Sequence, residues 1–306
     1  VVGQQQVIDG ILIALLTGGH ILLEGVPGLA KTLAVKTFAE ISGLDFKRIQ
    51  FTPDLLPADV TGTLICESQS GRFTVRKGPV FTNIVLADEI NRSPTKVQSA
   101  LFEAMAEHQV PIGDESYPLL QPFLVLATQN PIEQEGTYNL PEAELDRFLM
   151  KLLITYPSAE NEAKIIKSFG KAGEVSVRKI ISKDTISQMR QTLNTINCDD
   201  SLISYIVSIL TVTRNENNQK QKARTFSNDI TRYIQFGASP RAGIAILQCA
   251  KVQAMFGGRD FVLPEDIKNV VPKVLRHRLS LSYEAAADNI TADEIISKIL
   301  DFTPLP

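Results

Sequence analysis

The chain has 306 residues, of which 44% are hydrophobic and 21% charged, which is an ordinary globular balance. Its 31 basic and 34 acidic residues give a formal net charge of −3, which argues against nucleic acid as a broad, non-specific partner. Three widely separated cysteines without a C-x-x-C pair argue against a zinc site and against a secreted disulfide framework. Charged residues interrupt the most hydrophobic stretch, residues 7–25, so we expect no membrane span and a cytoplasmic protein.

The first half of the chain alternates predicted helices with predicted strands. Paired apolar positions recur every four residues over 7–16 and indicate a helix, which the glycines at 18–19 end. The elements that follow are a strand over 20–24, a helix over 31–41, strands over 46–51 and 83–88, a helix capped by Ser93 before Pro94, and strands over 122–127 and 149–155. Because these strands are nearly continuous apolar runs, they predict a parallel five-stranded sheet sandwiched by helices.

The alternation stops near residue 157, and beyond it almost every segment has helical spacing. Ser239-Pro240 and residues 263–266 are typical of helix starts, and residues 291–294 form a capping-box pattern. The polar run 215–224 is typical of an exposed loop. We therefore expect an α/β core domain over residues 1–156 and an all-α domain over residues 157–306.

Between the first predicted strand and the next helix lies a glycine-rich loop, Gly25-Val26-Pro27-Gly28-Leu29-Ala30-Lys31-Thr32. Backbone N–H groups of such a loop can surround phosphates, and the helix N-terminus adds its partial positive charge. Lys31 would reach the β- and γ-phosphates of ATP, and the Thr32 hydroxyl would bind Mg²⁺. The strict phosphate-loop pattern has glycine where this chain has Ala30, and one methyl group is a small departure. The alternative is a tight glycine turn followed by a surface lysine.

Polar side chains also follow two of the later predicted strands. Asp88 and Glu89 stand at the carboxyl end of a buried strand, which is the edge where ligands bind to open parallel sheets. Asp88 can hold Mg²⁺, and Glu89 can orient and deprotonate an attacking water. Asn130 ends the next strand, within reach of the γ-phosphate or of that water. The alternatives are a solvated or helix-capping acid pair and an ordinary Asn-Pro turn.

Several of these motifs together resemble one known family. The segments are GVPGLAKT, FTPDLLPADVTG, IVLADEINR, ATQNP, LPEAELDRF and GASPRA, and they resemble the MoxR family of AAA+ ATPases over nearly the whole chain. GVPGLAKT, with Ala30, is the form of the phosphate loop found in that family. The resemblance implies a P-loop NTPase core, a helical lid, hydrolysis of Mg-ATP, and a ring of subunits, usually a hexamer, with ATP between neighbours.

The resemblance also implies roles for residues outside the phosphate loop. Arg147 matches the arginine finger, which acts on ATP in the neighbouring subunit, where such a residue is worth ~10³ to 10⁵ in rate. Arg241 matches the second sensor, in the first turn of a lid helix. A cation there is unfavourable towards the helix dipole, so we expect a triphosphate or a nearby carboxylate to compensate it. Val2 and Gly3 match the segment that contacts adenine. A surface arginine that caps a strand is the alternative for Arg147.

These motifs specify the biological role of the protein less closely than its chemistry. The family implies chaperone-like remodelling or maturation of a protein partner, through an adaptor with a von Willebrand factor A domain. A nucleic-acid remodelling ATPase and a metal-chelatase or gas-vesicle-type assembly motor share these motifs and stay open as alternatives.

Two loops and two basic clusters complete the sequence predictions. The family places an insert within 63–79 and a hairpin over 109–119 near the pore of the ring. The glycines there suggest short hairpins, and ordinary surface loops stay open as the alternative. The basic clusters at 220–224 and 276–278 are interpreted as solvated faces. Neither the lone histidines nor the cysteines are assigned any chemistry.

Overall fold

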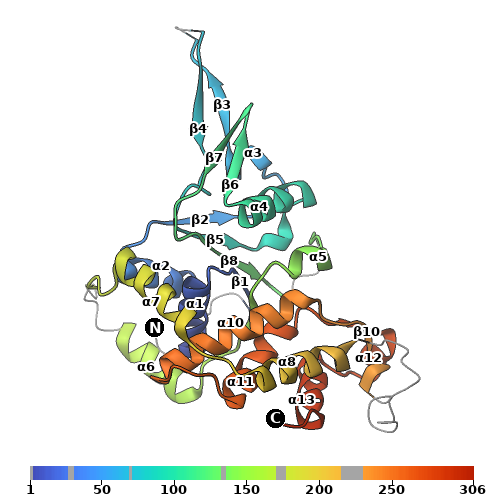
Figure 1. Cartoon of the computed structure of the whole chain (residues 1–306). Helices are drawn as coiled ribbons and strands as arrows, with labels where there is room; N and C mark the ends of the chain where they lie inside the picture. Colours follow the sequence, from blue (N-terminus) through green and yellow to red (C-terminus); the bar gives the residue numbers. More distant parts are fainter. Residues whose placement is uncertain (1–2, 27–30, 69–70, 132–135, 170–176, 215–229) are drawn as a thin grey trace. The chain divides into compact units, whose positions relative to one another are not determined.

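The computed structural model describes residues 3–26, 31–68, 71–131, 136–169, 177–214 and 230–306 (Figure 1). The chain forms two compact units. The first comprises Val1–Leu140 and Leu152–Gln188, and the second comprises Pro141–Lys151 and Met189–Pro306. A single cut near residue 157 does not separate these units, since each takes a segment from the other side of it. The domain limits 1–156 and 157–306 stay a prediction.

The sheet of five strands confirms the predicted fold class. Its strands lie in the order β2-β5-β8-β1-β9, and their bounds are β2 Phe46–Gln50, β5 Ile84–Asp88, β8 Leu124–Gln129, β1 Ile21–Gly25 and β9 Met150–Ile154. The three inner strands are buried along almost their whole length, because helices cover them. In the parallel register Ala87 of β5 pairs with Ala127 of β8, so Asp88 and Thr128 come next to each other at the carboxyl edge.

The helices of the first unit are α1 Gln5–Thr17, α2 Lys31–Ser42, α3 Pro57–Thr61, the 3₁₀ turn η1 Ile90–Arg92, α4 Thr95–Glu107, α6 Ala159–Phe169 and the start of α7 Lys183–Thr195. Gly18 ends α1 in the left-handed conformation with φ 76°, as predicted. The predicted cap of α4 was wrong by one residue. Pro94 is the N-cap, because the Ser93 hydroxyl instead donates to the Ile90 carbonyl of the preceding turn at 3.4 Å.

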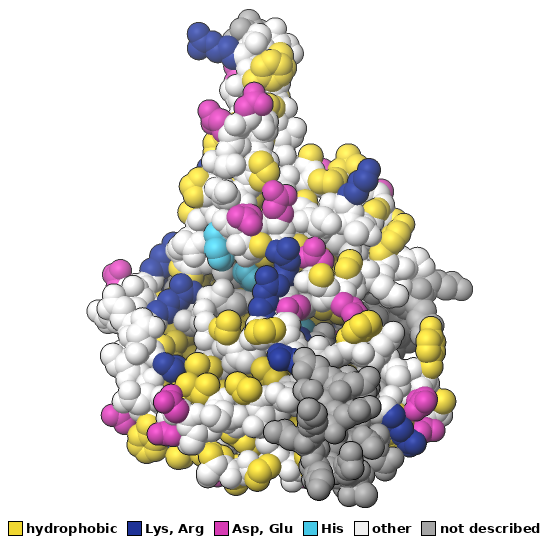
Figure 2. Space-filling view, turned by 45° about the vertical axis from the view of Figure 1, so that its right-hand side comes forward, with side chains coloured by type: hydrophobic (Ala, Val, Ile, Leu, Met, Phe, Trp, Pro, Cys, Tyr) yellow, Lys and Arg dark blue, Asp and Glu magenta, His cyan; other side chains and the backbone are white. Residues whose placement is uncertain are grey.

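Two antiparallel hairpins project side by side from this unit (Figure 1). They are β3 Gly62–Cys66 with β4 Phe73–Lys77, and β6 Gln109–Ile112 with β7 Glu115–Pro118, so the predicted hairpins are confirmed. The ammonium of Lys77 lies 5.4 Å from the ring centroid of Tyr117 and joins one hairpin to the other. Hydrophobic side chains are exposed along this projection (Figure 2), and Phe73 is 70% exposed.

The second unit is mainly helical, as predicted. Its elements are α5 Glu142–Leu145, α8 Asp200–Thr213, β10 Ile234–Phe236, α10 Pro240–Phe256, α11 Pro264–Leu275, β11 Ser280–Leu281, α12 Tyr283–Ala287 and α13 Ala292–Phe302. Ser239 caps α10, Leu263 is the N-cap of α11 and Thr291 caps α13, which confirms the three predicted starts. The run 215–224 lies outside the described residues. Within the described part of the chain, no helix has the length and apolar character needed to cross a bilayer.

Candidate active site

The carboxyl ends of β5 and β8 meet at Asp88 and Thr128. The Thr128 hydroxyl donates to Asp88 Oδ1 at 2.5 Å and accepts from the backbone N–H of Glu89 at 2.9 Å. This one hydroxyl therefore positions both members of the predicted acid pair. The sequence prediction placed polar groups on these neighbouring strand ends but missed Thr128, whose role depends on the register between the strands.

The edge strand β2 supplies two further partners that sequence reasoning missed. Arg48 donates to Asp88 Oδ2 from two guanidinium nitrogens, at 2.6 and 3.0 Å, and also to Gln50 Oε1 at 2.6 Å. Gln50 in turn donates to Glu89 Oε2 at 2.8 Å, and Arg92 donates to the same oxygen at 3.0 Å. Arg48 and Gln50 are two residues apart on one strand, so they share a face of it. This spacing on a predicted strand was the only sign in the sequence that the two side chains lie together.

Glu89 has an uncommon backbone conformation. Its φ of 56° and ψ of 48° are in the left-handed region, which costs a non-glycine residue on the order of 1 kcal/mol. The hydrogen bond from its N–H to Thr128 stabilises this turn. Strain of this kind is frequent where a side chain has to be aimed at a ligand. Here it turns the chain directly after β5, so that Asp88 and Glu89 project from the same edge.

Lys31 is the first residue of α2, and its amine is half-buried. Its Nζ donates to the Gly25 carbonyl at 2.5 Å. Burial lowers the pKa of Lys31, and the nearby carboxylates of Asp88, Glu89 and Glu24 oppose that shift. The predicted lysine and the predicted acid pair therefore lie within electrostatic range of each other.

The start of the phosphate loop requires glycine for steric reasons. A Cβ on Gly25 would lie 2.6 Å from the carbonyl oxygen of Ile154 on β9, so no other residue fits. Val26 is described as irregular backbone, and Pro27, Gly28, Leu29 and Ala30 lie outside the described residues. Thr32 is half-buried in the first turn of α2. Together, Thr32 and Asp88 offer a hydroxyl and a carboxylate, which are the hard oxygen donors that suit Mg²⁺.

A polar cavity of about 500 Å³ lies in the first unit at the carboxyl ends of β1 and β8, with Asn130 in its wall. Asn130 is 8% exposed, and the other lining residues include Glu24, Asn91, Gln129, Thr137 and Asn139. The cavity suits a polar ligand, because its walls carry carboxylate and amide groups. The described residues contain no cluster of three or more His, Cys, Asp or Glu that could hold a metal by themselves. A magnesium ion with phosphates needs only one or two protein ligands.

The proposed adenine segment is described only in part. Gly3 has a φ of 77°, and a Cβ there would lie 3.1 Å from Nδ2 of Asn161 on α6. Val2 lies outside the described residues. The backbone conformation of Gly3 therefore suits glycine, which is consistent with contact through backbone atoms.

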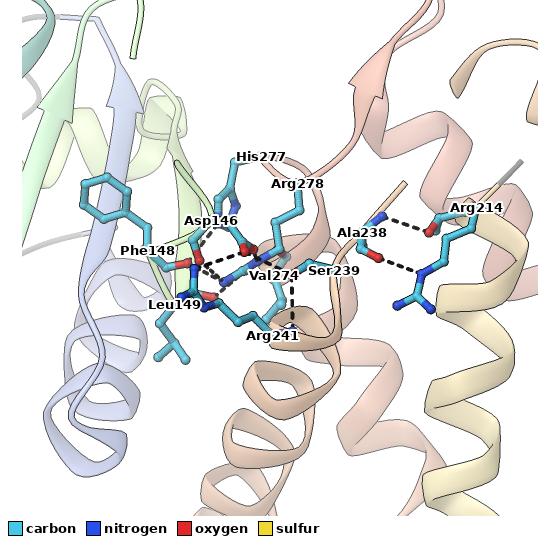
Figure 3. Close-up of polar contacts among 11 residues, drawn as sticks. Asp146, Phe148, Leu149, Arg214, Ala238, Ser239, Arg241, Val274, His277 and Arg278 are labelled. Atoms are coloured by element: carbon cyan, nitrogen blue, oxygen red, sulfur yellow. Dashed lines mark hydrogen bonds and ion pairs between the residues drawn. The ribbon is translucent and has the colours of Figure 1, made fainter. Parts of the chain in front are cut away.

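The two predicted arginines lie in the second unit, and each has a carboxylate beside it. Arg147 Nε lies 2.7 Å from Glu144 Oε2. Arg241 NH1 lies 3.6 Å from Asp146 Oδ2, and the Arg241 backbone N–H donates to the cap residue Ser239 (Figure 3). Of the two compensating groups expected for Arg241, the carboxylate is therefore present in the protein itself.

The predicted solvated face at residues 276–278 was wrong. The Arg276 and Arg278 side chains are only 13% and 3% exposed, and His277 is 8% exposed. All three reach the segment before and at the start of β9: Arg276 donates to the Lys151 carbonyl at 3.2 Å, and His277 Nε2 lies 3.0 Å from the Phe148 carbonyl. Backbone carbonyls thus take the place of solvent. The other basic cluster, 220–224, lies outside the described residues.

Comparison with known proteins gives consistent matches along the whole chain. Residues 20–150 match the ATPase family associated with various cellular activities (AAA), and residues 227–299 match the AAA lid domain. The full chain is 46% identical to Chaperone MoxR1 of Mycobacterium tuberculosis, of which it covers 79%, and 30% identical to Protein MoxR of Methylorubrum extorquens, of which it covers 92%. A solved structure from Cytophaga hutchinsonii has a TM-score of 0.90 and 50% identity, over all of this chain and 91% of that one.

Proposed function

Because this chain belongs to the MoxR family of AAA ATPases, we propose that it couples the hydrolysis of Mg-ATP to chaperone-like remodelling or maturation of a protein partner. ATP hydrolysis itself follows from membership of the family. The relative named Chaperone MoxR1 supports a protein as the client. We further propose a cytoplasmic ring, most simply a hexamer, and an adaptor with a von Willebrand factor A domain.

The residues at the sheet edge divide the chemistry among them. The backbone of Gly25–Thr32 and the Lys31 amine would bind the phosphates, and Thr32 and Asp88 would hold Mg²⁺. Bound Mg²⁺ neutralises charge on the β- and γ-phosphates. Glu89 would accept a proton from the attacking water, which Asn130 would orient. Val2 and Gly3 would contact adenine through their backbone.

Two arginines of the second unit would complete the site in the assembled ring. Arg147 would stabilise charge on the phosphoryl group in the neighbouring subunit, and Arg241 would contact the γ-phosphate bound by its own subunit. The helical domain, over residues 157–306, would act as a lid that moves when the nucleotide changes.

One observation carries this proposal: the half-buried Lys31, at the start of the helix that follows β1, lies in the field of Asp88 and Glu89. The test is titration of Lys31→Ala with a fluorescent ATP analogue and Mg²⁺. We expect binding to be lost by at least tenfold, since a charge-assisted contact to phosphate is worth roughly 1.5–3 kcal/mol. Lys36→Ala is the matched control, because Lys36 is on the same helix and its side chain is 62% exposed. Unchanged affinity in Lys31→Ala would refute the site.

A further inference from the structure

Arg278 holds the segment between α5 and β9 from inside the second unit. Its side chain is 3% exposed, and its five hydrogen bonds use every N–H of the guanidinium. Nε donates to Asp146 Oδ1 at 2.8 Å, and the other groups donate, at 2.6 to 3.1 Å, to the carbonyls of Asp146, Phe148, Leu149 and Val274 (Figure 3). Because a buried guanidinium is costly unless all its donors are satisfied, these bonds fix the backbone on both sides of residue 147.

The Asp146 carboxylate connects this anchor with α10. Its Oδ1 accepts from Arg278, while its Oδ2 accepts from the Ser239 hydroxyl at 3.0 Å and lies 3.6 Å from NH1 of Arg241. The side chain of Asp146 is 19% exposed, whereas that of Arg241 is 65% exposed. The contact with Arg241 is therefore long and solvated, and Asp146 can lose it at little cost.

Arg147 follows Asp146 directly and projects from the anchored backbone. Its side chain is 34% exposed, with Nε 2.7 Å from Glu144 Oε2. The carbonyls of Asp146 and Phe148, one on each side, accept hydrogen bonds from Arg278. A side chain that acts on a neighbouring site needs a rigid base of this kind.

We propose that Asp146 is a positioning residue shared by the two arginines. With Arg278 it fixes the base of Arg147, and through Oδ2 it retains Arg241 when no nucleotide is bound. This inference rests on the proposed roles of Arg147 and Arg241. Because the γ-phosphate and Asp146 compete for one cation, the carboxylate weakens ATP binding in its own subunit while it supports hydrolysis in the neighbouring subunit.

Asp146→Asn in the full chain tests whether Asp146 weakens ATP binding in its own subunit. Asparagine lacks the charge that retains Arg241, and its neutral amide is also a weaker acceptor for Arg278 than the carboxylate. We expect the Kd for a fluorescent, non-hydrolysable ATP analogue to fall about two- to fivefold, which is the effect of releasing an exposed ion pair. In an Arg241→Ala background the same change should leave the Kd unaltered. Damage to the fold would raise the Kd, so a purely structural role of Asp146 cannot produce this result.

Mixed rings test whether Asp146 supports hydrolysis in the neighbouring subunit. Donor subunits with Lys31→Ala supply Arg147 without binding ATP, and acceptor subunits with Arg147→Ala bind ATP without supplying a finger. Hydrolysis by the mixture therefore reports on the donor's Arg147. Adding Asp146→Asn to the donor should lower this hydrolysis ten- to a hundredfold, because a displacement of about 1 Å is enough for such a loss.

The control is Asp293→Asn in the donor, which removes a carboxylate that lies 3.0 Å from Arg276 in the same unit. It should leave both the Kd and the mixed-ring rate unchanged. If the mixed ring with the Asp146→Asn donor hydrolyses ATP as fast as the ring with the Asp293→Asn donor, the proposed role of Asp146 is refuted. A rise in the Kd of the Asp146→Asn variant would refute it as well. Neither result would affect the proposed function. If the mixture with intact Asp146 hydrolyses no ATP, the finger role of Arg147 fails, and this inference fails with it.

Discussion

The Gln50 amide on β2 donates to Glu89 Oε2 on the neighbouring strand end at 2.8 Å. Arg92 donates to the same oxygen at 3.0 Å. The carboxylate that we propose as the general base is therefore held by a neutral amide on one side and a cation on the other. Both contacts are to Oε2, so they restrain the carboxylate from turning towards an attacking water.

Gln50→Ala should therefore raise the basal rate of ATP hydrolysis, by about two- to fivefold, since one exposed hydrogen bond to a charged group is removed. The Kd for the ATP analogue should stay the same, because Gln50 contacts the proposed base and Lys31, the proposed phosphate ligand, is unchanged. Gln191→Ala, exposed on α7, serves as control. A slower rate would indicate that Gln50 orients Glu89 for catalysis instead of restraining it.

Glu89→Gln should bind ATP normally yet hydrolyse it at least 10²-fold more slowly, because an amide cannot accept the proton from water. With ATP present, this variant should also retain a protein client that the active protein releases, which affinity capture can measure. Glu103→Gln, exposed on α4, provides the matched control. Normal turnover would remove Glu89 from the mechanism.

Gly25→Ala should destabilise the protein by about 1–3 kcal/mol and weaken ATP binding, because the new methyl group meets the Ile154 carbonyl at 2.6 Å. Thermal unfolding and titration with the ATP analogue measure the two effects. Gly243→Ala in α10 is the contrast, since its methyl group would meet only side-chain methyl groups, of Leu210 at 3.0 Å and of Ile206 at 3.7 Å, and alanine favours a helix. Equal stability of both variants would contradict the steric argument.

Acid should destabilise the first unit through His20. Burial lowers its pKa from 6.5 to about 4, and the neutral ring accepts from the Val125 N–H through Nδ1 while Nε2 lies 3.3 Å from the Met105 carbonyl. Between pH 6.5 and 4 the unfolded chain binds a proton that the folded chain does not. The free energy of unfolding should therefore fall by about 3 kcal/mol over this range.

Urea unfolding across this pH range checks the prediction. His20→Asn should show a weaker dependence on pH. His108→Asn should keep most of the slope, because His108 is exposed and its charge is the smallest of the influences on the pKa of His20. A slope that stays the same in His20→Asn would assign the pH dependence to other groups.

Much of the fold was predictable because its signals are local. Apolar runs marked four of the five strands of the main sheet, β2 being the more polar exception, and spacing placed Lys31 at a helix start and Asp88 at a strand end. The error at Ser93 was equally local in origin. The Ser93 hydroxyl could cap α4 or bind the preceding turn, and in the structure it donates to the Ile90 carbonyl.

The partners of the site residues depended on contacts between distant parts of the chain. The sequence alone predicted which residues would bind phosphate and activate water, because these groups follow strands in a recognisable order. Only the tertiary structure decided that Thr128 and Arg48 would bind Asp88, and that Arg278 would be buried against Asp146. A run of basic residues looks solvated in a sequence. Whether it is buried depends on carbonyls more than 120 residues away, and periodicity carries no information about them.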